Sequence, residues 1–201
     1  MSSREDLMPT LRSRAKASRR DALLAAAAEL FARSGFNGVS IEDLGAAVGV
    51  SGPAVYRHFT GKQAVLTALL VGASDDLMTG GQAVVDAAAD APGALAALVR
   101  FHVRFALDNP DVIRVQDRDL GSLPDTDRHR VRALQRAYVE LWVSVLGQVH
   151  PSTPVTLLRM RAHATFGLIN STPHSAAAAS APAETVRALL EEMALAALTP
   201  R

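Results

Sequence analysis

The sequence predicts an all-α protein, and three observations support this fold class. Apolar residues recur at helical spacing along most of the 201 residues, and strand-like alternating runs are missing. Aromatic residues make up only 4% of the chain, whereas hydrophobic residues account for 49% and charged residues for 20%. This balance is typical of a globular protein with a packed core, and we expect about nine helices in total.

The first helix is predicted from a capping-box pattern. Ser18 stands three residues before Asp21, the first residue of the stretch DALLAAAAELFARSG. Gly35 is the last residue of that stretch, and a glycine in the left-handed conformation commonly terminates a helix. We therefore expect residues 1–17 to form a basic, flexible arm in front of the helix.

Two short helices are predicted next. Ser40 and Asp43 form another capping box, and Gly49 ends the helix that it opens. Ser51 is the expected N-cap of the following helix, with Pro53 in its first turn, where the missing N–H group costs nothing.

The rest of the chain is predicted to continue as helices separated by glycine and proline residues. Thr60-Gly61-Lys62 interrupts the helical pattern before a fourth helix, and Gly80-Gly81 marks the next expected interruption. The later helical stretches are expected at 94–108, 111–120, 125–149, 155–171 and 183–198.

Charge is distributed unevenly along the chain. The formal net charge is only +1, yet residues 1–62 carry nine basic and six acidic side chains, while residues 63–201 carry twelve and fourteen. A basic end on an acidic body is typical of a protein whose N-terminal part binds nucleic acid. A solvated basic tail is the alternative.

Several classes of protein are excluded or disfavoured. Cysteine is absent, so disulfides, thiolate chemistry and cysteine-ligated zinc are excluded. No glycine-rich phosphate loop, nucleophile elbow or His-x-x-x-His pair occurs, and we expect no catalytic residue, metal or cofactor. No apolar run approaches the ~18 residues of a membrane helix, and the N-terminus lacks the apolar core of a secretory signal. A soluble, cytoplasmic protein without a membrane partner is therefore expected.

The two short helices, joined through Gly49-Val50, predict a helix-turn-helix whose second helix enters the major groove of DNA. Little direct base reading is expected, because the first turn of that helix offers one hydroxyl and apolar contacts to thymine methyl groups. Alternatives are a core position for Tyr56 or His58 and an ordinary surface position for Lys62. The expected DNA contacts are Ser40, Ser51, Gly52, Pro53, Ala54, Tyr56, Arg57, His58 and Lys62.

The segment GFNGVSIEDLGAAVGVSGPAVYRHFTGKQAVLTALL resembles the N-terminal domain of the TetR family of transcriptional regulators. Pro53 departs from the family pattern, because it leaves no donor at a base-facing position. The residues that carry the resemblance are Gly35-Phe36, Ser40, Leu44 to Ala47, Gly49-Val50-Ser51, Tyr56-Arg57-His58-Phe59 and Lys62.

The resemblance implies two domains and a homodimer. Residues 1–64 would form a helix-turn-helix domain with its arm, and residues 65–201 a ligand-binding and dimerisation domain. The last two helices would form a four-helix bundle with a second copy, which would bind a palindromic operator as a repressor and leave it when a small molecule binds. Core packing within one protomer is the alternative for these positions, which are Leu158, Ala162, Val186, Leu189, Leu190 and Met193.

The effector is predicted from an apolar lining with arginines at its edges. Within families like this one, acyl-coenzyme A thioesters and fatty acids combine a greasy and an anionic end, and we expect an effector of this kind. A flat hydrophobic drug that controls an efflux gene is one alternative. A DNA-binding architectural protein without an effector is another, although it would favour a smaller and more basic second part. The expected ligand contacts are Phe101, Phe105, Arg118, Tyr138, Trp142, Phe166, Asn170 and His174.

Overall fold

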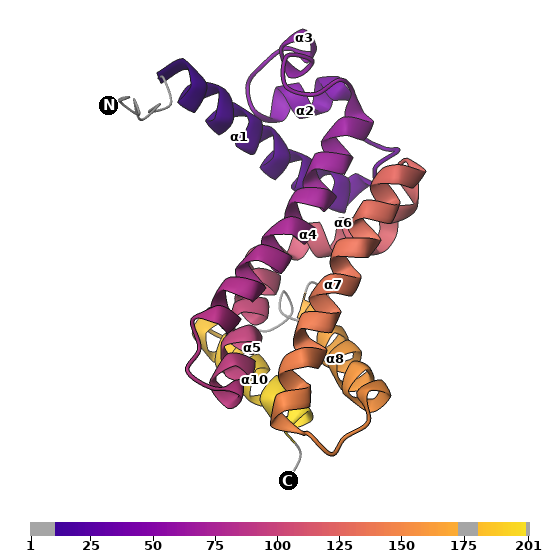
Figure 1. Cartoon of the computed structure of the whole chain (residues 1–201). Coiled ribbons are helices and arrows are strands. Elements are labelled where there is room, and N and C mark those ends of the chain that lie inside the picture. Colours follow the sequence, from indigo (N-terminus) through magenta and orange to yellow (C-terminus); the bar gives the residue numbers. More distant parts are fainter. Residues whose placement is uncertain (1–10, 173–180, 200–201) are drawn as a thin grey trace, which may run out of the picture.

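The computed structural model describes residues 11–172 and 181–199, with side chains from residue 17 onward. This part of the chain contains nine α-helices, one 3-10 turn and no strand, which confirms the predicted all-α class (Figure 1). The elements are α1 (Leu11–Ser34), α2 (Ile41–Ala47), α3 (Gly52–Val55), α4 (Lys62–Asp86), α5 (Ala91–Asp108), α6 (Pro110–Asp119), η1 (Leu120–Ser122), α7 (Asp125–Val149), α8 (Val155–Asn170) and α10 (Ala183–Leu198).

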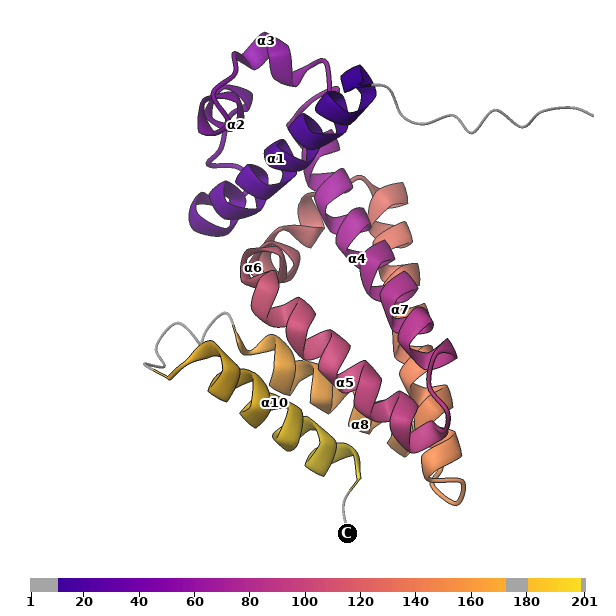
Figure 2. The ribbon, with the colours of Figure 1, turned by 90° about the vertical axis from the view of Figure 1, so that its left-hand side faces the viewer.

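The helices form two regions, and two long helices run from one region to the other. Helices α1 to α3 gather at one end of the molecule, and α4 and α7 run side by side from there to the other end (Figure 1). Figure 2 shows α10 lying along α5, on the side away from α4 and α7. None of the helices in the described ranges is long and apolar enough to cross a membrane.

Helix α1 begins earlier than predicted. It starts at Leu11, so Ser18 lies inside the helix and the capping box predicted there is wrong. The residues between Leu11 and Arg20 are mostly arginine, alanine and lysine, which favour helix strongly enough to carry it through the serine. Part of the predicted arm is therefore helical, and the first ten residues lie outside the described part of the chain.

Helix α4 runs through Gly80 and Gly81, where a break was predicted, and ends at Asp86. Both glycines allow neighbouring helices to come close. A Cβ atom on Gly80 would lie 2.4 Å from the ring of Phe101, and one on Gly81 would lie 2.5 Å from the ring of Tyr138. These glycines serve packing rather than chain reversal.

The buried side chains form two clusters, and the first includes residues from both predicted domains. Leu23, Phe31 and Leu44 pack there with Val115 of α6 and with Val131 of α7. The predicted boundary after residue 64 falls inside α4, which passes through both clusters. Helix α1, which also packs against α2, rests on α6, so the helix-turn-helix is connected to the second half through α1.

Candidate nucleic-acid interface and inner pocket

Helix α2 begins with the predicted capping box. The Ser40 hydroxyl accepts a hydrogen bond from the Asp43 backbone N–H (3.1 Å) and donates one to the Asp43 carboxylate (2.6 Å). That carboxylate also accepts from the Ser40 backbone N–H (2.8 Å). The hydrogen bond from the Ser40 hydroxyl to this carboxylate lowers the pKa of Asp43, and the bond from the Ser40 backbone N–H lowers it further by a smaller amount. The capping-box prediction is confirmed, and the start of α2 is fixed at the surface.

Two glycines shape the turn between α2 and α3. Gly49 has φ +69°, the left-handed conformation predicted for the end of α2. Gly45 is buried, and a Cβ atom there would lie 2.7 Å from the backbone oxygen of Val50. The sequence pattern singled out the segment around Gly45 but not this close approach, which depends on where the turn folds back.

Helix α3 is a single turn. Ser51 is its N-cap residue and makes no side-chain capping bond, while Pro53 is exposed in the first turn. Gly52, predicted among the DNA contacts, is buried, and a Cβ atom on it would lie 3.2 Å from a carboxylate oxygen of Glu42. Gly52 therefore packs α3 against α2, and the outward face of this turn consists of Ser51, Pro53 and the half-buried Ala54.

The residues after α3 divide between surface and interior. Tyr56 is 55% exposed and Arg57 is also exposed, which excludes the alternative of a core tyrosine. His58 is half-buried, and its Nδ1 atom is buried without a hydrogen-bond partner among the described residues. Phe59 is buried. Tyr56 and Arg57 are thus the side chains best placed to reach a phosphate from this face.

Lys62 does not fit the predicted phosphate contact. Its ammonium group donates to the backbone carbonyls of Phe36 (2.8 Å) and Val39 (2.7 Å) and lies 4.5 Å from the centre of the Phe36 ring. The lysine is half-buried and holds the loop after α1 against the start of α4. In the structure Lys62 therefore fastens the loop that precedes the helix-turn-helix, and its predicted phosphate contact has no support there.

An inner pocket of about 260 Å³ lies among α4, α5, α6, α7 and α8. Three of the predicted ligand residues line it: Tyr138 and Phe166, whose rings stack at 5.7 Å, and Asn170. Leu77 and Gln116 come from α4 and α6. The pocket combines apolar and aromatic side chains with polar groups that could orient a ligand, as small-molecule sites do.

His102 is the central residue of this pocket, and the sequence reasoning missed it. Its ring is buried, with Nε2 3.2 Å from Asn170 Oδ1 and Nδ1 3.3 Å from the Tyr138 hydroxyl oxygen. Burial lowers its pKa to about 4, against a smaller opposing effect of the bond to Asn170, and burial also raises the pKa of Tyr138. Both groups are therefore uncharged at neutral pH.

Three other predicted ligand residues lie around the pocket or outside it. Trp142 is fully buried and packs edge-on against Phe166 (5.0 Å), so it supports the pocket from behind. Phe105 stacks on His102 (6.4 Å) but lines a separate cleft against α1 and α4. Phe101 packs against Gly80 of α4 and lines a different pocket, together with Arg100 and Arg187. His174 lies outside the described residues.

The prediction that Arg118 contacts the ligand is wrong, because its side chain is bonded elsewhere and does not line the pocket. Its guanidinium donates to the backbone carbonyls of Phe31 and Ala32, at the end of α1, and to the carboxylate of Asp119. Carbonyl groups in the last turn of a helix lack intrahelical partners, and an arginine satisfies them well. Arg118 therefore ties α6 to α1.

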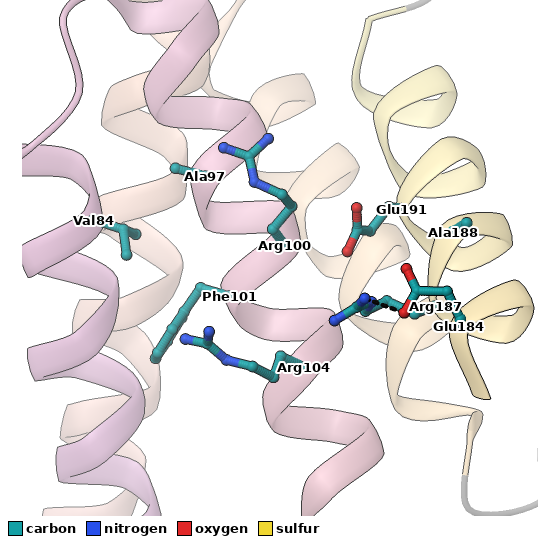
Figure 3. A pocket seen from close by; sticks show the side chains of 9 residues that line it. All are labelled: Val84, Ala97, Arg100, Phe101, Arg104, Glu184, Arg187, Ala188 and Glu191. Atoms are coloured by element: carbon teal, nitrogen blue, oxygen red, sulfur yellow. Dashed lines mark hydrogen bonds and ion pairs between the residues drawn. The ribbon is translucent and has the colours of Figure 1, made fainter.

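An outer groove of about 440 Å³ lies between α5 and α10 (Figure 3). Arg100 and Arg104 extend from α5 beside Phe101, and Arg187 of α10 is paired with Glu184. The pairing lowers the pKa of Glu184. This exposed surface carries both charges, in contrast to the uncharged inner pocket.

The predicted dimer face divides into buried and exposed residues. Leu158 and Ala162 are 3% and 0% exposed, so they belong to the core of the protomer and their assignment to the interface is wrong. Val186 and Leu190 are half-buried. Leu189 and Met193 remain exposed on α10. The sequence missed exposed apolar residues on α8, where Leu157 is 48% and Met160 66% exposed.

Comparisons with known proteins agree with this architecture. Residues 23–69 match the family model for bacterial regulatory proteins of the tetR family, and residues 89–174 match a tetracyclin repressor-like C-terminal domain. The HTH-type transcriptional repressor KstR2 of Rhodococcus jostii is 28% identical over 132 residues, which are 65% of each chain. The match thus spans just under two thirds of that relative.

Solved structures share the fold over most of the chain. A TetR-family transcriptional regulator from Bordetella parapertussis has a TM-score of 0.78 and 26% identity, covering 88% of this chain and 94% of its own. AibR, in complex with isovaleryl coenzyme A and operator DNA, has a TM-score of 0.71, covering 87% and 97%. At 17% identity this second likeness shows the fold alone. The two matched family models and the helix-turn-helix geometry together show that the chain belongs to the TetR family of bacterial transcriptional regulators.

Proposed function

We propose that this protein is an effector-responsive repressor that binds a palindromic operator as a homodimer in the cytoplasm. The outward face of α3 and the exposed Tyr56 and Arg57 form the DNA-binding surface. The inner pocket receives the effector. In this proposal residues 65–201 sense the small molecule and the preceding part of the chain binds DNA.

The observation that carries the proposal is the position of α6. Gln116 of this helix lines the inner pocket, and Arg118, two residues later, is bonded to the last carbonyls of α1. One short helix therefore touches both the pocket and the helix that supports the helix-turn-helix. A ligand that binds more tightly to one position of α6 increases the population of that position. Because Arg118 bonds α6 to α1, the position of α1 shifts with it.

The exposed apolar residues of α8 and α10 support assembly with a second copy. Leu157, Met160, Leu189 and Met193 are exposed on two helices that pack beside each other. Apolar side chains grouped in this way mark an interaction surface. A two-fold dimer would place two α3 helices about one turn of duplex apart, and its operator would be palindromic.

For the effector we propose a compact apolar or amphipathic molecule. AibR, which shares the fold, is described with isovaleryl coenzyme A, and the pocket of about 260 Å³ suits a short acyl group. A long fatty acid has less support, because Arg118, which was expected at the pocket mouth, is bonded to α1 instead. An architectural role needs no such pocket.

The experiment combines selection of DNA sequences from a random duplex pool with sedimentation of charge variants. We expect a palindromic sequence to be enriched. Met160→Glu and Leu189→Glu should give monomers that bind this palindrome at least tenfold more weakly, because each change places an unpaired charge in the interface. Arg136→Glu, at an exposed position on α7, is the control and should remain dimeric. Full-strength dimers of both α8 and α10 variants, or selection of no sequence, would contradict the proposal.

Effector release is tested in the same assay by adding isovaleryl-coenzyme A to the protein–DNA complex. We expect it to release DNA from the wild type. Arg118→Ala should retain DNA binding but require a higher effector concentration, since α6 has lost its bonds to α1. Arg128→Ala is the control, because Arg128 bonds to the nearby Leu123 carbonyl instead. An equal response of Arg118→Ala and the wild type would contradict the role of α6.

A further inference from the structure

We infer that the inner pocket binds the effector through an uncharged carbonyl group, which accepts a hydrogen bond from the side-chain amide of Asn170. The ligand class is a compact ketone, amide, ester or thioester rather than a free carboxylate. This inference rests on the proposed function, because it specifies the chemistry of the pocket that function assigns to the effector. Three features of the pocket support it: its hydrogen-bond pattern, its lack of charge and its shape.

The hydrogen bonds of His102 leave a donor free on Asn170. A neutral imidazole has one N–H donor and one acceptor nitrogen. Because Nε2 faces Asn170 Oδ1, it carries the hydrogen and donates, and Nδ1 then accepts from the Tyr138 hydroxyl. The Asn170 side-chain nitrogen has no partner among the described residues, and Asn170 lines the cavity. Its two N–H groups are available to a ligand oxygen.

His102 therefore acts as a positioning residue. Its ring holds the Asn170 amide with the oxygen turned toward Nε2 and the nitrogen turned away from it. Ser74, also in the lining, donates to the backbone carbonyl of Leu70 (2.8 Å), so its hydroxyl hydrogen is not available. Further amide groups come from Gln116 on α6 and Gln135 on α7. The polar part of the pocket thus offers amide groups, of which the one on Asn170 is held by the neutral His102.

The lining carries no fixed charge. Among the residues that the structure describes, it contains no aspartate, glutamate, lysine or arginine, and its second histidine, His163, is exposed. Burial keeps His102 neutral, with its pKa lowered to about 4. A carboxylate moved from water into such a site loses its hydration without gaining a cation, which is strongly unfavourable. A carbonyl group loses much less and gains the amide hydrogen bond.

The apolar part of the pocket limits the size of the ligand. The Phe166 and Tyr138 rings lie nearly parallel, at 15°, and Leu77, Leu134 and Val139 complete the apolar wall. The volume of about 260 Å³ lies just below the ~300–1,000 Å³ of typical drug-sized pockets. A short branched chain or a single ring fits this space, with its carbonyl oxygen toward Asn170.

The test uses matched probes that differ in charge but hardly in shape. The aliphatic set is 4-methyl-2-pentanone, isovaleramide and isovalerate, and the aromatic set is acetophenone, benzamide and benzoate. Binding to the full chain is measured by calorimetry at pH 7.5. In at least one set we expect the two uncharged compounds to bind at least tenfold more tightly than the carboxylate. Equal or tighter binding of the carboxylates, or binding of neither set, overturns the inference.

Variants locate the contact. Asn170→Asp keeps the shape but has no N–H donor, and it should weaken the uncharged probes at least tenfold, as should Asn170→Leu. Circular dichroism and gel filtration establish that each variant is folded, and two substitutions of different character guard against a variant that fails to fold. Arg104→Ala, in the outer groove, is the control and should bind like the wild type. Wild-type affinity in a folded Asn170 variant overturns the assignment.

Measuring DNA release separately distinguishes the two proposals. If the uncharged probes bind in the pocket but never release DNA from the wild type, the proposed release mechanism fails while the ligand class stands. If carboxylates bind and release DNA while uncharged probes do not, the repressor function stands and the ligand class is wrong.

Discussion

The DNA-binding end and the inner pocket use polar groups in different ways. At the DNA-binding end, Ser40 and Asp43 pair three residues apart on an exposed surface. Around the pocket, His102 is buried and joins Asn170 and Tyr138, which lie 68 and 36 residues away. The first kind of pairing fixes local chain geometry, whereas the second fixes how distant helices meet. The two regions should therefore respond differently to changes in pH, charge and volume.

Acid should destabilise the pocket region most. The pKa of His102 is lowered to about 4 in the folded protein, from 6.5 for an unperturbed histidine. Between these values the unfolded chain binds a proton that the folded chain excludes, so stability is full above pH 6.5 and is lost as pH falls toward 4. The loss from this group is on the order of 3 kcal/mol.

Urea unfolding at pH 7 and at pH 4.5 measures this effect. His102→Gln, which retains hydrogen-bonding groups but does not titrate, should lose less stability between the two pH values than the wild type. Equal losses in the two proteins would show that another group causes the acid dependence.

The strongest response at the DNA-binding end is expected from Lys62. Lys62→Met retains the apolar stem and removes the ammonium group that binds the Phe36 and Val39 carbonyls. We expect a loss of about 2 kcal/mol of unfolding free energy, because two part-buried carbonyls lose a charged donor. The control is Arg33→Met, since Arg33 forms an exposed helical pair with Glu29 and its loss should cost less than about 0.5 kcal/mol. Similar costs for the two variants would contradict the fastening role of Lys62.

A volume change in the turn should have a smaller effect. Gly45→Ala places a methyl group 2.7 Å from the backbone oxygen of Val50 and should cost about 1–2 kcal/mol. Gly72→Ala is the matched control, because a Cβ atom on that α4 residue meets nothing within 4 Å and alanine favours helix. Thermal unfolding of both variants measures the difference in stability between them. Equal stabilities would show that the turn can accommodate the methyl group without strain.

The smallest effect on stability is expected from the exposed Arg57. Arg57→Ala should change unfolding free energy by less than about 0.5 kcal/mol. In DNA binding it should lower the slope of log affinity against log salt by about one unit for each protomer, because one phosphate contact is lost. Lys62→Met should leave that slope unchanged. A changed slope for Lys62→Met would restore the lysine to the DNA surface.

The features that the sequence predicted correctly depend on neighbours in the chain. The Ser40 capping box, the left-handed glycines and the later helix bounds follow from spacings of a few residues. The same local reading failed at Ser18, where strong helix formers on both sides outweighed a capping pattern.

The features that it missed depend on tertiary contacts. A single histidine on an apolar helix face looks the same whether it is alone in the core or joined to Tyr138 and Asn170. Arg118 could not be placed without knowing that α6 packs against the end of α1, more than 80 residues earlier. Likewise, the dimer prediction assigned Leu158 to an exposed face, whereas this side chain turns into the core of the protomer.

Helix α4 gives the molecule a lever. Its 25 residues form a rod of ~37 Å, with Lys62 fastened to the helix-turn-helix at one end and Leu77 in the pocket wall beyond its midpoint. A tilt of ~5° about one end of such a rod displaces the other end by ~3 Å. That displacement is close to the ~3.4 Å rise of one base pair, so in the proposed two-fold dimer a small angular change would shift the spacing of the two α3 helices by about one or two base-pair steps.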